Sequence, residues 1–376
     1  MKRDLIRLSR SIVGEAEAEA VSRVLIDDGY LGMGREVQAL EEEIARFLGV
    51  PREWVTCVNS GTAALHLAVQ AVAQPGDGVL VQSLTYLASF QAITAANAVP
   101  VPCEVVPGTL TLDVDDARRR VTPRAHVVMP VHYASNPGEL DATYEFAREQ
   151  GFRVIEDAAH AFGCTYKRQL IGSFGDIVAF SFDGIKNITS GEGGAVVTRD
   201  SRVAQFVQDA RLLGVQKDTQ KRYSGQRSWD FDVSHQGYRY HMSNLLAAIG
   251  RVQLRRFEKE FRPRRVELAR KYRTSLKDLN GLRLLEGEPG DIVPHIFPVR
   301  VLTGRRDQLR QYLLDKGIES GIHYKPNHLL SYYGARQGLL PVTEELYDQL
   351  LTLPLHPGLT DDDIDYVVDQ LKQYFA

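Results

Sequence analysis

The sequence predicts an α/β protein in which a large, mostly parallel sheet is followed by a smaller C-terminal α+β domain. Between about residues 52 and 200, short valine-rich runs alternate with stretches whose apolar residues have helical spacing. A long helical region at 243–279 ends this alternation. The 376 residues are enough for two domains, and we place the boundary inside that helical region, giving a large domain at 1–255 and a small one at 256–376.

Composition and charge exclude several classes of protein. With 44% hydrophobic and 25% charged residues, the chain resembles ordinary globular proteins rather than disordered or fibrous ones. A net charge of -3 gives no basic surplus for nucleic acid or an anionic membrane, and no apolar run approaches the ~18 residues of a membrane span. The N-terminus reads poorly as a signal peptide, and the scattered Cys57, Cys103 and Cys164 fit a reducing compartment, so we expect a cytoplasmic protein.

The expected elements follow one another in a regular order. Two helices come first, at 15–26 and 37–48, the second closed by Gly49 and Pro51. Short apolar runs flanked by Gly, Pro or Asp predict strands at 54–58, 79–81, 99–105, 126–131, 152–155, 177–182 and 195–198. Helical spacing of apolar residues predicts helices at 63–72 and 140–150. The helical region at 243–279 is broken near Pro263, and a strand at 295–302, a helix at 306–316, a strand at 318–323 and a last helix capped by Thr360 follow.

The segment NSGTAAL at 59–65 follows the first of these core strands and opens a helix. Ligands of parallel sheets bind at the carboxyl ends of the strands, so such loops are where chemistry is expected. Unpaired N–H groups at a helix N-terminus favour an anion, and small residues let a phosphate come close. A plain N-capped helix is the alternative.

Asp157 and Lys186 stand at the ends of two further strands. An aspartate there is partly buried and requires a cationic partner, which a pyridinium nitrogen would supply; otherwise it is a helix or loop cap. Lys186 lies on a glycine-flanked loop, where desolvation or a neighbouring cation can remove its proton and allow a Schiff base with an aldehyde. The alternative is a solvated loop lysine. Ser181, at the end of the same strand, offers a hydroxyl to a phosphate.

Together these three features match the needs of pyridoxal 5'-phosphate (PLP), which are a phosphate cradle, a partner for the ring nitrogen and an amine for the aldehyde carbon. The motifs SGTAAL (60–65), EDAAHA (156–161) and SFDGIKNITSGEGG (181–194) resemble the signatures of the DegT/DnrJ-type nucleotide-sugar aminotransferases, which are fold-type I PLP enzymes. The resemblance extends from GYLGMG (29–34) through GYRYHMSNLLAAIG (237–250) to GIHYKPNH (321–328).

The resemblance implies roles for single residues. Lys186 forms the Schiff base and moves the proton, and Asp157 pairs with the ring nitrogen. Tyr86 stacks on the ring, His160 lies near the phenolic oxygen, and Ser181 binds the phosphate together with the amides at 61–63. The implied cofactor-binding residues are therefore Gly61, Thr62, Ala63, Tyr86, Asp157, His160, Ser181, Lys186, Arg239 and His241.

The segment 237–242 departs from the commoner family pattern. Many members read Gly-aromatic-Asn-Tyr-Arg-Met, whereas this chain reads Gly-Tyr-Arg-Tyr-His-Met, so either Arg239 or His241 contacts the cofactor phosphate. By resemblance the segment reaches the neighbouring subunit, which implies a homodimer with shared active sites. The implied substrate-binding residues are Tyr30, Arg239, His323, Tyr324 and His328. A metal site at His323 and His328 has little support, because no cysteine or carboxylate joins them at ligand spacing.

Two further groups are interpreted without the resemblance. His132 and Tyr133 end a strand, and their role stays open. The run Arg118, Arg119 and Arg120 is expected on a solvated helix face.

The resemblance implies an aminotransferase that moves an amino group from L-glutamate to a keto group, at C4, of a nucleotide-linked sugar. Three alternatives remain. A sugar 3-dehydratase of the same family would carry His in place of Lys186, so the lysine speaks against it. An aminotransferase could also act on a ketone without a nucleotide, such as an inosose. A PLP-binding regulator without turnover is made less plausible by the complete Lys186–Asp157 pair.

Overall fold

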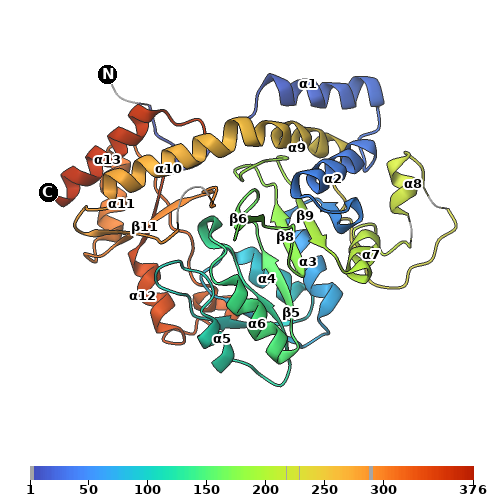
Figure 1. Cartoon of the computed structure of the whole chain (residues 1–376), viewed down its shortest axis with the longest axis horizontal. Helices are drawn as coiled ribbons and strands as arrows, with labels where there is room; N and C mark the ends of the chain where they lie inside the picture. Colours follow the sequence, from blue (N-terminus) through green and yellow to red (C-terminus); the bar gives the residue numbers. More distant parts are fainter. Residues whose placement is uncertain (1–3, 217, 228, 288–290) are drawn as a thin grey trace.

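A seven-stranded sheet forms the centre of the computed structural model, which describes residues 4–216, 218–227, 229–287 and 291–376 (Figure 1). The strand order is β1-β9-β8-β5-β4-β2-β3. The four pairs from β8 to β3 are parallel, whereas β9 is antiparallel to both of its neighbours. The strands are β1 Val55–Val58, β2 Gly78–Gln82, β3 Val99–Cys103, β4 Ala125–Met129, β5 Arg153–Asp157, β8 Ile177–Ser181 and β9 Gly194–Thr198. The mostly parallel sheet is therefore as the sequence predicts.

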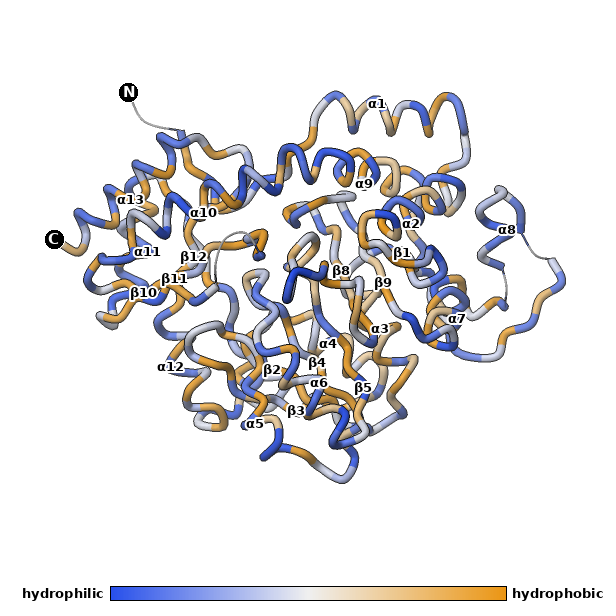
Figure 2. Tube along the Cα trace, in the orientation of Figure 1, coloured by the Kyte–Doolittle hydropathy of each residue, from blue (hydrophilic) through white to orange (hydrophobic). Residues whose placement is uncertain are grey.

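Helices cover both faces of this sheet, which explains why its strands are nearly continuous apolar runs. In β4, Val127 and Met129 pack under α3, α4 and α7, whereas Val128 packs under α5 and α6. Figure 2 shows apolar residues gathered in the interior strands and alternating with polar ones along the outer helices. The covering helices are α2 Arg35–Leu48, α3 Gly61–Val72, α4 Leu87–Ala95, α5 Val114–Arg119, α6 Leu140–Gln150 and α7 Ser201–Ala210.

The helical region after the sheet forms one long rod across the molecule (Figure 1). It consists of α9 Asn244–Arg256, a π-helical turn Phe257–Phe261 and α10 Arg262–Leu276. The expected break near Pro263 takes the form of that π-helical turn, and Pro263 lies in the first turn of α10, where its missing N–H costs no hydrogen bond. The other short elements are α1 Glu15–Arg23, which ends in a π-helical turn Val24–Asp28, the strands β6 Thr165–Tyr166 and β7 Gln169–Leu170, and α8 Thr219–Tyr223. Four 3-10 helices in the described residues are Arg52–Trp54, Tyr133–Ser135, Asn327–Leu329 and Ser331–Tyr333.

The C-terminal part carries a second, antiparallel sheet in the order β10-β11-β12. Its strands are Leu282–Leu284, Phe297–Val301 and Leu350–Leu353, and its helices are α11 Arg306–Asp315, α12 Pro341–Gln349 and α13 Asp361–Phe375. Thr360 caps α13 as expected, because its hydroxyl accepts the N–H of Asp363 at 3.1 Å.

The expected strand at 318–323 is wrong. Only Ile318 and Gly321 form single bridges, with Ile6 and Thr352. The physical reason is that the backbone of the segment is divided between two partners: Glu319 donates to the Ile6 carbonyl at 2.9 Å, whereas Gly321 bonds to Thr352, so no continuous ladder forms. The division at residue 255 stays a prediction.

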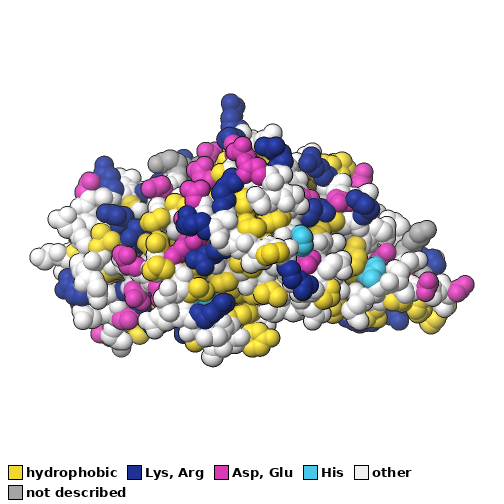
Figure 3. Space-filling view, turned by 90° about the horizontal axis from the view of Figure 1, so that it is seen from below, with side chains coloured by type: hydrophobic (Ala, Val, Ile, Leu, Met, Phe, Trp, Pro, Cys, Tyr) yellow, Lys and Arg dark blue, Asp and Glu magenta, His cyan; other side chains and the backbone are white. Residues whose placement is uncertain are grey.

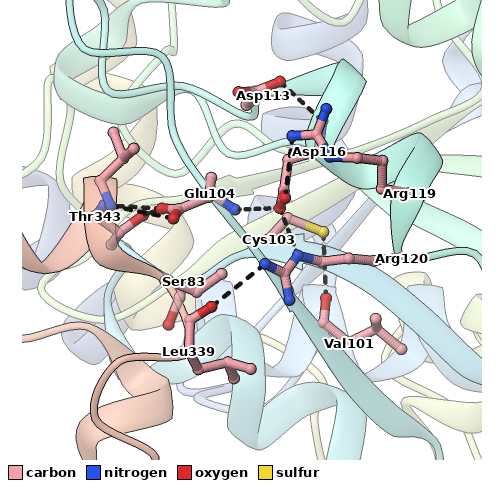
Figure 4. Close-up of polar contacts among 12 residues, drawn as sticks. Ser83, Val101, Cys103, Glu104, Asp113, Asp116, Arg119, Arg120, Leu339 and Thr343 are labelled. Atoms are coloured by element: carbon pink, nitrogen blue, oxygen red, sulfur yellow. Dashed lines mark hydrogen bonds and ion pairs between the residues drawn. The ribbon is translucent and has the colours of Figure 1, made fainter.

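The junction between α12 and β3 is a network of polar contacts (Figure 4). The Glu104 carboxylate accepts the backbone N–H groups of Val342 (3.1 Å) and Thr343 (2.8 Å) at the start of α12. Arg120 was expected in solvent, but it is half-buried, because its guanidinium pairs with Asp116 and donates to the Leu339 carbonyl at 3.4 Å. The expected solvated face therefore holds for Arg118 and Arg119, and is wrong for Arg120.

The outer surface mixes charges of both signs. Figure 3 shows basic and acidic side chains interspersed on the face viewed there, with apolar side chains between them. In the described part of the chain, no helix is both long and apolar enough to cross a lipid bilayer.

Candidate active site

A cavity of about 360 Å³ opens at the carboxyl ends of the central strands. Its floor comes from the loops after β1, β2, β4, β5 and β8, as the rule for parallel sheets predicts. Of the residues that the sequence singles out, the cavity is lined by Gly61, Thr62, Tyr86, Tyr133, Asp157, His160, Ser181, Lys186, His323 and Tyr324. Ala63, in the next position of α3, is buried and lies behind the lining.

The start of α3 and the end of β8 lie against each other at one side of the cavity. Ser60 caps α3, because its hydroxyl accepts the N–H of Ala63 at 3.1 Å. A Cβ atom added to Gly61 would lie 2.7 Å from Cβ of Ser181 and 2.9 Å from its hydroxyl, so only glycine permits this approach. The helix N-terminus and the Ser181 hydroxyl therefore face one small space that suits an anion.

Asp157 is a buried carboxylate at the end of β5, 4% exposed. Its Oδ2 accepts the Ser89 hydroxyl at 2.7 Å, and its Oδ1 accepts the N–H of Ala159 at 3.2 Å. Burial raises the pKa of Asp157, while these hydrogen bonds and the charges of Lys186 and His132 oppose the rise. A cation bound in the cavity would stabilise the ionised carboxylate further.

Lys186 reaches the cavity from the loop after β8. Burial lowers the pKa of its amino group to about 8, although Asp183 and Asp157 act in the opposite direction. Nζ lies 3.4 Å from Nε2 of His295. A pKa of about 8 leaves about a tenth of this amine uncharged at pH 7, far more than for an ordinary lysine, and a nucleophilic amine requires the uncharged form.

The remaining wall is made of aromatic and imidazole side chains. The Tyr324 hydroxyl lies 3.2 Å from Nε2 of His160, and the centroid of the Tyr324 ring lies 5.4 Å from that of the Tyr86 ring. His323 contacts the Thr352 hydroxyl through Nδ1 at 2.9 Å, and its backbone carbonyl accepts the Tyr133 hydroxyl. Burial lowers the pKa of His160 well below its ordinary value, and that of His323 to about 4, so both imidazoles are uncharged at neutral pH.

Several predicted site residues do not reach this cavity within one chain. Tyr30, Arg239 and His241 lie beyond its lining, at the side of β1 and α9. His328 is fully buried, where Nδ1 contacts the Ser83 hydroxyl at 2.7 Å and Nε2 contacts Glu344 at 3.0 Å. The role of His132 stays open; its Nε2 lies 3.1 Å from Oε2 of Glu156, and both side chains are fully buried.

Sequence reasoning missed several residues of the site. Asp183 and Glu192 line the cavity, and Ser89 contacts Asp157. His295, which contacts Lys186, is 109 positions away along the chain. Asp183 and Glu192 belong to the quoted motif at 181–194 and could have been found there, whereas His295 has no local signature.

This combination of fold and side chains defines a class of protein. An anion cradle, a buried carboxylate and a partly uncharged lysine around one cavity of a mostly parallel sheet are the features of an enzyme that uses PLP. Comparison with known proteins gives the family.

A model of the DegT/DnrJ/EryC1/StrS aminotransferase family matches residues 11–372. A dTDP-4-dehydro-2,3,6-trideoxy-D-glucose 4-aminotransferase from Saccharopolyspora spinosa is 36% identical over 98% of this chain and 96% of its own length. Among solved structures, the aminotransferase TlmJ from Streptoalloteichus hindustanus is 33% identical, with a TM-score of 0.90 and 98% of both chains covered. Spr1654 from Streptococcus pneumoniae in its PLP form is 28% identical, with a TM-score of 0.89 over 98% of both chains.

The chain belongs to the DegT/DnrJ/EryC1/StrS aminotransferase family. It is therefore an aminotransferase, and the family implies PLP dependence, which confirms the resemblance and the fold-type I prediction. The residues of this chain fit the cofactor. The space that a Cβ at Gly61 would fill lies beside the anion cradle, and the buried carboxylate and the amine line the same cavity.

Proposed function

We propose that this enzyme transfers an amino group from L-glutamate to the C4 keto group of a nucleotide-linked sugar. The observation that carries the proposal is the single cavity that unites Lys186, Asp157 and the start of α3. The relative from Saccharopolyspora spinosa, whose name specifies a dTDP-linked 4-keto sugar and a 4-aminotransferase, supports the substrate class and the C4 position. The three buried free thiols suit a reducing compartment, so we place the reaction in the cytoplasm.

Cofactor binding divides among three parts of the cavity. The N–H groups at the start of α3, with the Ser181 hydroxyl, would bind the phosphate. Asp157 would pair with the ring nitrogen and keep it protonated. Tyr86, which is 58% exposed at the rim, offers a flat face to the ring, and His160 would lie near the phenolic oxygen.

Lys186 would perform the proton transfer. When bound, PLP supplies an aldehyde that reacts with amines and a ring that takes up electron density from the adjacent carbon. Nζ of Lys186, which is uncharged in part of the molecules, would be the amine that holds the aldehyde, and when free it would carry the proton between the carbon that bears the amine and the cofactor carbon. Asp157, which is buried at the end of β5, would pair with the ring nitrogen and stabilise its positive charge.

The sugar would lie against the wall formed by His323 and Tyr324. Uncharged imidazole and phenol groups can donate and accept hydrogen bonds, as recognition of sugar hydroxyls requires. His328 would act through its neighbours rather than on the sugar, because it is buried against Ser83 and Glu344.

A homodimer would complete the site with the segments of Tyr30 and Arg239. The side chain of Asn244 joins these two segments, since its Nδ2 donates to the Tyr30 carbonyl at 2.8 Å and Asn244 directly follows the 237–243 segment. They lie together but away from the lining of the cavity in their own chain. Exposed apolar side chains accompany them, including Leu31 (44%) and Leu213 (46%). We propose that an isologous interface brings this surface to the partner's cavity.

The function is tested with a panel of UDP-, GDP- and dTDP-linked keto-sugars and L-glutamate. We expect 2-oxoglutarate to form with at least one 4-keto sugar and NMR of the product to place the new amino group at C4. The Lys186→Ala variant, assayed on the same panel, should form none. Absence of 2-oxoglutarate with every nucleotide-linked sugar, or an amino group at C3, contradicts the proposal.

A further inference from the structure

Arg265 is a buried arginine with no acidic partner in the described part of the chain. It belongs to α10 and is 2% exposed. Its Nη1 donates to the carbonyls of Pro294 and His295, both at 3.2 Å, and its Nε has no partner. The nearby Arg262 and Arg264 instead pair with glutamates. Burial of an unpaired charge is costly, so this arginine calls for a reason other than stability.

The contacts of Arg265 lead to the lysine of the active site. The carbonyl of His295 accepts from Arg265, and the backbone N–H of His295 donates to the Ser135 hydroxyl at 2.9 Å. The His295 ring packs against the ring of His160, with 4.5 Å between centroids. Because the backbone is held on both sides and the ring is packed, Nε2 of His295 stays at 3.4 Å from Nζ of Lys186.

The groups around Lys186 shift the pKa of its amino group in opposite directions. Asp157 and Asp183 favour the ammonium form, whereas burial and the charge of Arg265 favour the uncharged amine. The imidazoles of His160, His295 and His323 are uncharged at neutral pH, because burial lowers the pKa of each. Among the described groups that act on this lysine, Arg265 is therefore the one that carries a positive charge at neutral pH.

We propose that Arg265 is a positioning residue for Lys186, which fixes the His295 turn against Nζ and places a lasting positive charge behind the amino group. An arginine suits this role better than a lysine or histidine, because burial lowers the pKa of Arg265 only to about 10, so its guanidinium keeps its charge at neutral pH. The inference gives Arg265 a part in the proposed reaction and rests on that function, but its test requires neither cofactor nor sugar.

The test measures the titration of Lys186 in the full-length, cofactor-free protein. Acetic anhydride labels uncharged amines, and peptide mapping after labelling between about pH 6 and pH 10 gives an apparent pKa for this one lysine. In the wild type we expect a pKa of about 8. Arg265→Met and Arg265→Gln should raise it, so that labelling of Lys186 at pH 7 falls about threefold to tenfold. Arg265→Lys, which keeps the charge, should stay close to the wild type.

Arg300→Met is the matched control. Arg300 is also buried (8% exposed) and donates to a carbonyl, that of Pro107, at 3.2 Å, but it does not act on Lys186. It should leave the titration of Lys186 unchanged.

The proposal is overturned if the neutral Arg265 variants label like the wild type, or if Arg300→Met moves the pKa as far. Should Arg265→Met fail to fold, Arg265→Gln decides, because its amide can still donate to the carbonyls. A wild type that aminates no sugar would refute the proposed function and leave the labelling result standing.

Discussion

Replacement of Gly61 by alanine should weaken PLP binding about 10- to 100-fold. The added Cβ would lie 2.7 Å from Cβ of Ser181, whereas ordinary contacts begin at 3.4 Å, so about 0.7 Å of separation has to be created. The Ser181 backbone is also close, with Cα at 3.2 Å, and Ser181 ends a strand paired on both sides. The first turn of α3 therefore has to move rather than the sheet.

This movement has two energetic consequences. Overpacking of this kind lowers the free energy of unfolding by about 1–3 kcal/mol. It also separates the N–H groups of α3 from the Ser181 hydroxyl, so the phosphate loses at least one charge-assisted hydrogen bond of about 1.5–3 kcal/mol. The second value converts to the stated loss of affinity.

The assay is a visible-absorbance titration of the cofactor-free protein with PLP, accompanied by thermal unfolding. Gly184→Ala is the control, because its added Cβ would meet only the Ser11 hydroxyl at 3.5 Å and the Gly191 carbonyl at 3.7 Å. It lies on the loop of Lys186 and should bind PLP within about threefold of the wild type. If Gly61→Ala unfolds earlier but binds PLP as tightly as the wild type, the start of α3 is not the phosphate site.

Four further predictions concern the groups around the cofactor. Asp157→Asn should lower kcat by about 100-fold or more and keep PLP affinity within about tenfold, by steady-state kinetics and titration; near-normal kcat would make Asp157 a structural cap. Burial raises the pKa of Asp157 above its unfolded value, so the protonated carboxyl stabilises the cofactor-free fold, and this contribution is lost as the pH rises from the unfolded pKa to the folded one. Over that pH interval the Asn variant should therefore lose less thermal stability than the wild type. Attachment of PLP to cofactor-free enzyme should accelerate as pH rises through about 8, where Lys186 loses its proton, and a rate independent of pH would contradict this assignment. Mixed Lys186→Ala and Arg239→Ala subunits should recover about a quarter of wild-type activity, because half of the dimers then carry one intact site; no recovery after verified exchange would refute the shared site.

The fold could be predicted where each strand has its own local signal. The valine-rich runs place β1 to β5, β8 and β9 within a few residues, because strands buried on both faces are apolar throughout. The strands of the second sheet were harder to predict, since they are short and lie far apart in the sequence. The strand expected at 318–323 has the right residue types, but its backbone bonds first to Ile6 and then to Thr352, so it forms two single bridges and no ladder. Which partners a segment meets is a property of the assembled fold and leaves no local signal.

The residues of the site also divide into those with a local sequence signal and those without one. Gly61, Asp157, Ser181 and Lys186 were predictable because each stands where a core strand ends, and a parallel sheet brings such ends to one edge. His295 was not, because it reaches Lys186 from a segment 109 positions away, and no spacing rule connects them. The contact of Arg120 with the Leu339 carbonyl was missed for the same reason, since that carbonyl lies 219 positions away, whereas the pair of Arg120 with Asp116 has the local i,i+4 spacing and could have been predicted.

The GIHYKPNH segment shows how one motif can serve two purposes. His323 and Tyr324 line the cavity, whereas His328 faces away from it. Asn327 donates to the carbonyls of Ser83 and Thr85 at 3.2 and 2.9 Å, and His328 contacts the Ser83 hydroxyl. These contacts hold the segment that leads into Tyr86, so the motif both supplies part of the cavity wall and fixes the loop that carries the expected stacking ring. A histidine assigned to substrate from its motif can therefore be essential to the site without touching the ligand, because two facing walls have to be held at one spacing.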